Sequence, residues 1–350
     1  DKDLVRKAFC AHLITDKDQD LQLLGGDYCV ARGTRVNTTR GPIAVEAVTP
    51  GDMVIIEDGS LHTVSARIDK GPQAVRTITT RMGYELTATA LHRIRVVDEN
   101  GDYVWRRVGE LQATDRVAIQ RGGWYSGSPW LLPPVPDATH LNQRSFTLPA
   151  PDERLAYLLG YILGDGSVQP KEVSLVVGHK ENDLVTPLRD TLRSYGLNPL
   201  MRSYRGVTEL RVRSKLFSAW VRLLMPEGKR ALPAWVGYLD RSLASVFLRG
   251  LFDSDGSMSG DRISWSGKHR QLALDVQHTL LRLGVPTIRS QQTTKLNGKS
   301  FALHKLAVPS AYGEHFQVTI GFAGAEKQRR LNEYLLHAGT SAEIGSYPNL

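Results

Sequence analysis

The chain has 350 residues, a hydrophobic content of 41% and a formal net charge of +8, which allows two or three domains and suits a polyanionic partner. Its two cysteines, Cys10 and Cys29, exclude a disulfide framework and a cysteine-rich zinc site. The sequence shows neither a secretory signal at Asp1-Lys2-Asp3 nor an apolar stretch long enough to span a membrane. We therefore expect a cytoplasmic protein, from a prokaryote or phage, with no membrane partner.

The first 28 residues carry few signals. Leu4–Ile14 is predicted to form a helix, and residues 24–27 a turn. Cys10 lies in no motif, so it is interpreted as a small buried apolar residue.

Residues 29–120 are predicted to form an all-β region. Short alternating runs are separated by turn pairs such as Asp58-Gly59, Lys70-Gly71 and Asn100-Gly101, which favour hairpins. The predicted strands cover residues 34–37, 43–47, 53–56, 62–68, 74–80, 84–88, 93–97, 103–107 and 116–119.

Four segments of this region, in order, resemble the N-terminal splicing blocks of inteins, whose fold is shared with hedgehog autoprocessing domains. They are residues 29–36, 43–54, 86–94 and 105–117. The resemblance implies a Hint-type module over residues 29–120 and a host-protein segment over residues 1–28. It also implies that the Cys29 thiol attacks the preceding carbonyl, while His92 protonates the leaving nitrogen and Thr89 polarises the amide. Taken singly, Cys29 and His92 would be read as ordinary buried residues.

Residues 121–150 are rich in Gly, Pro, Ser and Trp. This composition predicts a linker between modules, or an arm that touches DNA.

Two similar nine-residue motifs follow, Leu158–Gly166 and Leu248–Gly256, and the second begins 90 residues after the first. Each is an apolar helical stretch that ends in an acid and a glycine. A repeated unit predicts two halves related by a pseudo-two-fold axis, with Asp165 and Asp255 near that axis. Two carboxylates at one place favour a bound cation.

The two motifs resemble those of LAGLIDADG homing endonucleases. The resemblance covers residues 151–340, with repeats at about 151–236 and 243–338, and residues 341–350 form a tail. It implies that Gly160 and Gly250 allow close helix packing, and that Asp165 and Asp255 hold Mg²⁺, with Mn²⁺ as a substitute. Asp253 is interpreted as a helix-end residue.

The downstream order of elements is similar in the two repeats. In the first, strands are expected through Lys215 and a helix from Leu216. In the second, a final strand and helix are expected within residues 316–336. The fold class is therefore predicted to be α+β, an all-β module followed by a pseudo-symmetric α/β domain with DNA-binding antiparallel sheets.

Polar residues alternate along one strand of each repeat, as expected for one face of a sheet that reads DNA. An ordinary solvated strand face would give a similar pattern. The predicted DNA-binding residues are Arg202, Arg205, Arg211, Arg213 and Lys215 in the first repeat, and Arg289, Gln291 and Lys295 in the second.

Residues 228–233 resemble the lysine-containing element that follows the first repeat in inteins with nucleases. Lys229 is the predicted catalytic lysine, and Arg230 is its rival. In the second repeat Lys299 and Lys305 are weak candidates. Asn349 is interpreted as a loop residue, because Pro348 stands where a terminal splicing element would place histidine; the second splicing half is expected to be absent from this chain.

The predicted function is site-specific, metal-dependent double-strand cleavage of DNA by an intein-encoded endonuclease. The expected partner is duplex DNA with the uninterrupted host-gene sequence, bound by a monomer. Two alternatives are an RNA-binding maturase of the same fold and a DNA-binding protein that no longer cleaves.

Overall fold

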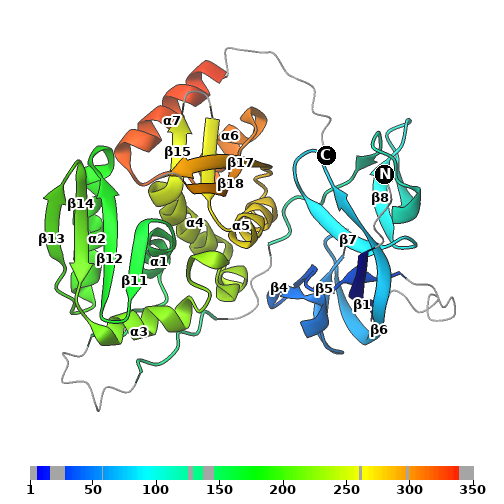
Figure 1. Ribbon diagram of the computed structural model, residues 1–350, viewed down its shortest axis with the longest axis horizontal. Coiled ribbons are helices and arrows are strands. Elements are labelled where there is room, and N and C mark those ends of the chain that lie inside the picture. The colour runs from blue at the N-terminus through cyan, green and yellow to red at the C-terminus, as the bar shows by residue number, and fades with distance from the viewer. Residues whose placement is uncertain are drawn as a thin grey trace. The chain divides into compact units, whose positions relative to one another are not determined.

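The computed structural model describes residues 6–15, 28–56, 58–124, 129–136, 146–259, 262–296 and 299–338. The chain divides into two compact units, which meet in sequence after Gly127. Strands make up the first unit and a repeated mixture of helices and strands the second, so the predicted α+β class is confirmed (Figure 1). Among the described residues, none of the helices combines the length and apolar character that a membrane crossing requires.

The first unit contains a seven-stranded sheet and a three-stranded sheet, with strand orders β1-β2-β7-β6-β5-β3-β4 and β10-β8-β9. Two short 3₁₀ turns lie at Val45–Ala47 and Val108–Glu110. The strands are β1 Arg6–Thr15, β2 Val30–Ala31, β3 Arg35–Thr38, β4 Gly41–Ala44, β5 Met53–Ile55, β6 Leu61–Thr79, β7 Glu85–Thr89, β8 Arg93–Val97, β9 Tyr103–Arg107 and β10 Arg116–Val117.

The helix predicted at Leu4–Ile14 is wrong, because Arg6–Thr15 forms strand β1. Pairing with β6 and β2 supplies backbone hydrogen bonds that outweigh weak local helix propensity. The turn predicted at Lys70-Gly71 is also wrong. Gly71 has a φ of 66° and lies at a register shift inside the single long strand β6, so it forms a bulge rather than a reversal.

The second unit contains two copies of one helix–strand unit, each with a four-stranded antiparallel sheet. The strand orders β11-β12-β14-β13 and β15-β16-β18-β17 correspond. The first copy contains α1 Glu153–Asp165, β11 Gly166–Gln169, β12 Glu172–Gly178, η5 His179–Leu184, α2 Val185–Ser194, β13 Leu200–Tyr204, β14 Val207–Val212, α3 Lys215–Leu224, η6 Gly228–Arg230 and η7 Ala234–Tyr238.

The second copy repeats this order. It contains α4 Arg241–Asp255, β15 Gly256–Ser259, β16 Arg262–Gly267, α5 Arg270–Arg282, β17 Ile288–Leu296, β18 Lys299–Ala307, η8 Ser310–Tyr312, α6 Gly313–Thr319 and α7 Ala325–Ala338. Two expected boundaries differ. Strand β14 ends at Val212, and Ser214 caps the helix that begins at Lys215. The strand expected from Phe316 is helix α6, whose Phe316 is fully buried.

Helices α1 and α4 run side by side between the two sheets of this unit, and each contacts its own sheet (Figure 1). Their contact is very close, because a Cβ at Gly160 would lie 1.9 Å from the Phe247 carbonyl oxygen and one at Gly250 would lie 2.2 Å from that of Tyr157. Only glycine fits at either position. The core around the helices is apolar, with Leu158 and Leu248 fully buried, so hydrophobic burial holds the two copies together.

Candidate functional sites

In the first unit, Thr89 forms hydrogen bonds with both backbone groups of Cys29, its N–H and its carbonyl. The Cys29 N–H donates to the Thr89 hydroxyl at 3.1 Å, and the Cys29 carbonyl accepts from the Thr89 N–H at 3.0 Å and from its hydroxyl at 3.3 Å. The contact follows from pairing between β2 and β7, in which Val30 lies opposite Ala88. Both residues are buried. The backbone of Cys29 is therefore fixed next to a hydroxyl group.

His92 lies on the turn that leaves β7. Its N–H donates to the Thr89 carbonyl at 3.1 Å, and its own carbonyl accepts from the Val108 N–H at 2.8 Å. The guanidinium of Arg93 lies 5.4 Å from the ring centre of Tyr28, the residue before Cys29. The structure thus gathers the predicted residues Cys29, Thr89 and His92 at one corner of the first unit.

Cys10 is buried in one small apolar cluster with Cys29 and Val75. Burial raises the pKa of the Cys10 thiol. The interpretation of Cys10 as a buried residue agrees with this position, but nothing in the sequence indicated that its neighbour would be Cys29.

In the second unit, both motif helices begin and end in the same way. Asp152 and Asp240 cap α1 and α4 by accepting from the backbone N–H three residues ahead, at 2.9 and 2.8 Å. At the other end, each acid is followed by a glycine that begins a strand at once. A Cβ at Gly256 would lie 2.3 Å from the Phe252 carbonyl oxygen, so the abrupt exit requires glycine.

The acids at the two helix ends lie close enough for their charges to interact. A Cβ at Gly164, next to Asp165, would lie 3.3 Å from Cγ of Asp255. The pKa of Asp255 is raised to about 6, mainly because the carboxyl is partly buried and secondly because the negative charge of Asp165 is nearby. Burial also raises the pKa of Asp165, although the nearby ammonium groups of Lys229 and Lys327 oppose that rise.

This pair can hold a divalent cation. In the described residues, no group of three or more His, Cys, Asp and Glu side chains is arranged to hold a metal ion, so ligands beyond the two carboxylates would be main-chain oxygens or water. Two neighbouring carboxylates, Asp165 exposed to solvent and Asp255 half-buried, form an oxygen-only donor set, which suits Mg²⁺. The predicted metal residues Asp165 and Asp255 therefore fit the ion that was expected.

One lysine reaches the end of each motif helix. The Lys229 ammonium donates to the Gly164 carbonyl, next to Asp165. The Lys327 ammonium donates to the carbonyls of Asp253 and Phe252, two and three residues before Asp255. Burial lowers the pKa of Lys327, whereas the surrounding carboxylates, Asp165 and Asp255 among them, raise it.

Lys327 is the second-repeat lysine that sequence reasoning missed. Of the candidates proposed instead, Lys305 lies in β18 opposite Ser290, and the side chain of Lys299 is outside the described residues. The available signal was spacing, because Lys229 follows Asp165, and Lys327 follows Asp255, by similar distances along the chain.

Asp253 does more than end a helix. Its side chain is only 2% exposed and accepts from the Tyr157 hydroxyl at 2.8 Å and from the N–H groups of Ala323 and Gly324 at 2.9 and 3.2 Å. It thereby ties the second motif helix to the first and to the segment just before α7, which carries Lys327. In the first copy the equivalent position is Leu163.

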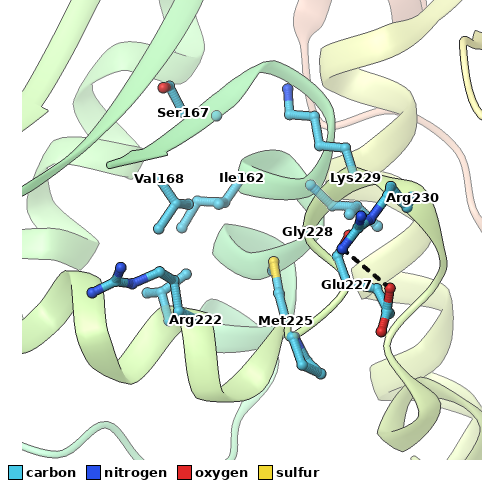
Figure 2. A pocket seen from close by; sticks show the side chains of 13 residues that line it. Ile162, Ser167, Val168, Arg222, Met225, Glu227, Gly228, Lys229 and Arg230 are labelled. Atoms are coloured by element: carbon cyan, nitrogen blue, oxygen red, sulfur yellow. Dashed lines mark hydrogen bonds and ion pairs between the residues drawn. The ribbon is translucent and has the colours of Figure 1, made fainter. Parts of the chain in front are cut away.

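A cavity of about 650 Å³ lies beside the first motif, between α1, β11, α3 and η6. Figure 2 shows its apolar side at Ile162, Val168 and Met225 and the cationic side chains of η6. There Arg230 pairs with Glu227 at 3.5 Å, while Lys229 extends separately. Lys229, rather than its rival Arg230, contacts the motif helix.

The basic residues predicted in the first repeat do not all lie on one strand. Arg202 in β13 lies opposite Glu209 in β14, so both share a face with Arg211. On that face Arg211 pairs with Glu209 at 2.9 Å and lies 3.8 Å from Glu172. Arg205 is in the β13–β14 turn with a φ of 46°. Arg213 follows the strand, and Lys215 begins α3, so neither belongs to the alternating set.

In the second repeat the predicted DNA-binding residues whose side chains the structure describes lie on the face of the sheet that packs against helix α5, not on the open face. Arg289 is opposite Leu306, which is opposite Trp265. Leu306 and Trp265 are each 1% exposed and belong to the side that packs against α5. Gln291 shares this side but is exposed beyond the helix, and the side chain of Lys295 is outside the described residues. Because side chains alternate, a shift of one residue changes the face.

The opposite, open face of that sheet carries a different polar set. Its members are Ser264, Ser266, Ser290, Gln292, Thr294 and Lys305.

Comparison with known proteins agrees with both units. Residues 28–89 match a family model described as a Hint domain, and residues 242–321 match one described as a LAGLIDADG-like domain. The DNA gyrase A subunit of Mycobacterium malmoense is 29% identical over 287 residues, which cover 76% of this chain and 54% of that protein. The replication factor C small subunit of Methanocaldococcus jannaschii is 24% identical, over 83% of this chain and 15% of that protein.

The chain thus spans about half, or less, of the curated relatives that it matches. Among solved structures, I-DmoI in complex with DNA and Mn is 21% identical and covers 48% of this chain and 96% of that chain, with a TM-score of 0.37. The family matches and the residues gathered in each unit agree with the two resemblances drawn from sequence. The chain therefore combines a Hint domain in its first unit with a LAGLIDADG-like domain in its second.

Proposed function

We propose that the second unit is a site-specific DNA endonuclease that makes metal-dependent double-strand breaks. The observation that carries this proposal is the pairing of Asp165 and Asp255 at the ends of two closely packed helices, each helix end contacted by its own lysine. A duplex has two scissile phosphates related by a two-fold axis, so two matched half-sites in one chain suit it. The partner is double-stranded DNA carrying the uninterrupted host-gene sequence, bound by a monomer.

In this mechanism Asp165 and Asp255 would hold Mg²⁺. When bound, the ion activates water and stabilises the leaving oxygen of the phosphodiester. Lys229 and Lys327 offset the carboxylate charge and stabilise the negative charge that develops on the phosphate. The close contact at Gly160 and Gly250 fixes the distance between the two acids.

The open sheet faces would bind the duplex. Arg202 and Arg211 in the first repeat supply phosphate contacts and base contacts. In the second repeat we assign this role to Gln292 and Lys305, because Arg289 lies on the helix-facing side. Arg205, Arg213 and Lys215 remain candidates for phosphate contacts at the edge of the first sheet.

The test uses a pool of duplexes with a randomised central segment, incubated with Mg²⁺, with Mn²⁺ and with chelator. Sequencing of the cut ends recovers the target. Asp165→Asn and Asp255→Asn should abolish metal-dependent cutting, while Asp190→Asn, a change on the exposed surface of α2, should leave it intact. Full activity of the double Asn variant would refute the assignment.

The same experiment, with a structured RNA pool and a binding measurement added, separates the alternatives. A maturase would bind a structured RNA pool in preference to duplex DNA and would leave both intact. A DNA-binding protein without cleavage would retain the selected duplex but produce no cut ends. Retention of both Asp165 and Asp255, together with a lysine at each helix end, favours cleavage over either alternative.

We further propose that the first unit performs the opening step of protein splicing. The Cys29 sulfur attacks the Tyr28 carbonyl carbon, the Tyr28–Cys29 C–N bond breaks, and a thioester and a free amine form. The proton lost from the thiol is balanced by the proton that the amine gains, which His92 delivers. The contacts of Thr89 with the Cys29 N–H and carbonyl support this proposal, because they hold the amide in place.

A strong external thiol tests this step, since it intercepts a thioester but leaves an ordinary amide intact. Mass spectrometry under denaturing conditions should show a break between Tyr28 and Cys29. Cys29→Ala should abolish the break and His92→Ala should slow it greatly, whereas Cys10→Ala should preserve it. If neither this chain nor a longer chain that carries a second splicing half yields a break, the unit is a scaffold.

A further inference from the structure

Strand β1, which precedes Cys29, closes a ring of strands. It pairs with β2 through Cys10 opposite Ala31, and with β6 from Arg6 opposite Val75 to Thr15 opposite Val64. Since β2 also pairs with β7, and β7 with β6, the four strands return to their starting point. Residues that the splicing resemblance assigns to the host protein are therefore built into the sheet of the Hint domain.

The long strand β6 depends on this partner. It pairs with β5 only from Leu61 to Thr63 and with β7 only from Val75 to Thr79. In the described part of the chain, β1 is the strand that pairs with the stretch between. Without β1, this stretch would present an open edge of backbone donors and acceptors, and such edges readily accept another extended strand.

The same strand covers the Cys29 thiol. Cys29 has no exposed surface, and it packs against Cys10 of β1 and Val75 of β6. The Phe9 carbonyl accepts from the Arg32 N–H at 2.8 Å, which fastens β1 just beyond β2. Movement of β1 would therefore uncover one side of the residue that carries the sulfur.

Few large side chains of β1 are fully buried among those that the structure describes. Cys10 and Ala11 are buried, Leu13 packs partly buried against the cluster of Ile43, Val48, Val54 and Val64, and Phe9 is 61% exposed. A segment held mainly by backbone hydrogen bonds and few large buried side chains opens more easily than the core. The strand is thus suited to exchange.

We propose that the β6 edge from Val64 to Val75 is a strand-acceptor surface, that residues 6–15 occupy it reversibly, and that this occupancy controls access to the Cys29 thiol. A consequence is that residues 1–28 stay bound after a break at Tyr28–Cys29. Only that consequence rests on the proposed thioester chemistry; the shielding itself does not.

Alkylation of the full chain by iodoacetamide, with Cys29 quantified by peptide mass spectrometry, tests the proposal. Phe9→Pro removes a backbone donor and strains the strand, whereas Phe9→Ala changes only an exposed side chain. We expect Phe9→Pro to raise the Cys29 labelling rate about tenfold, the factor for a strain of about 1.4 kcal/mol in β1, and Phe9→Ala to leave it unchanged. Equal labelling in both variants would overturn the proposal.

A second variant that lacks residues 1–15 should label rapidly, and an added synthetic peptide of residues 5–16 should restore protection. Hydrogen exchange in the same samples distinguishes strand displacement from unfolding. If the backbone amides of β8 and β9 stay protected from exchange while Cys29 is labelled, β1 has been displaced from an otherwise folded unit. If their protection is lost together with the protection of Cys29, β1 is an ordinary part of the fold and the proposal is wrong. Because alkylation requires no thioester, failure of thiol-induced cleavage would leave this result independent.

Discussion

Replacing Gly160 by alanine tests the closest contact in the second unit. The added Cβ would lie 1.9 Å from the Phe247 carbonyl oxygen, whereas ordinary contacts begin near 3.4 Å. The obstacle is backbone, which cannot rotate away as a side chain can, so α1 and α4 must separate locally by about 1.5 Å. Overpacking of this kind costs about 1–3 kcal/mol, and alanine regains about 0.5–1 kcal/mol of helix propensity. We expect a net loss of about 1 kcal/mol.

Catalysis should suffer more than stability. Separation of the helices displaces Asp165 from Asp255, and a misplacement of about 1 Å can cost a factor of about 100 in rate. Urea unfolding followed by tryptophan fluorescence would measure the first effect, and cleavage of the selected duplex the second. Gly324→Ala is the matched control, because its Cβ would meet Leu184 at 3.4 Å and Asp253 at 3.5 Å. An unchanged midpoint and rate for Gly160→Ala would refute the close packing.

Three further predictions concern the charged groups around the acids. Lys327→Met should slow cleavage about 100-fold by removing charge stabilisation, whereas Lys171→Met, in an exposed turn, should not, as single-turnover kinetics would show. In chelator, Asp255→Asn should stabilise the protein at pH 7 by about 1–3 kcal/mol. The Asp255 pKa of about 6 in the folded protein exceeds its ordinary value of 3.8, so protonation of Asp255 stabilises the folded state. This stabilisation is complete below about pH 4 and is lost as the pH rises through 6. The unfolding curves of the original protein and of Asp255→Asn should therefore converge below about pH 4. Asp253→Leu, which copies Leu163, should lower the unfolding midpoint, because it leaves three donors without their acceptor.

The sequence was sufficient to predict those helices, strands and site residues that depend on patterns of neighbouring residues along the chain. The motif helices, the glycines between them and the two acids follow from an apolar period that ends in acid and glycine. The β-rich first unit follows from alternation and turn pairs. The family matches confirm that both resemblances were correct.

Features that depend on tertiary pairing could not be predicted. Strand β1 exists because β6 offers an edge, not because Arg6–Thr15 prefers to be extended. The polar face of the second sheet was assigned one residue out of phase, since alternation alone does not say which set faces the core, and the burial of Leu306 decides it. Lys327 is in no recognisable motif, so its spacing from Asp255 was the available signal, and the fold brings its ammonium to the carbonyls of Asp253 and Phe252.

The two copies keep the same chemistry at their helix ends but support it in different ways. In the first copy Lys229 comes from the short 3₁₀ turn η6, whose neighbour Arg230 is engaged by the exposed Glu227. In the second copy Lys327 comes from the first turn of α7, and the buried carboxylate of Asp253 fixes the segment that leads into it. A buried carboxylate with three donors resists displacement more strongly than a solvated ion pair. The lysine of the second copy is therefore the more rigidly positioned of the two.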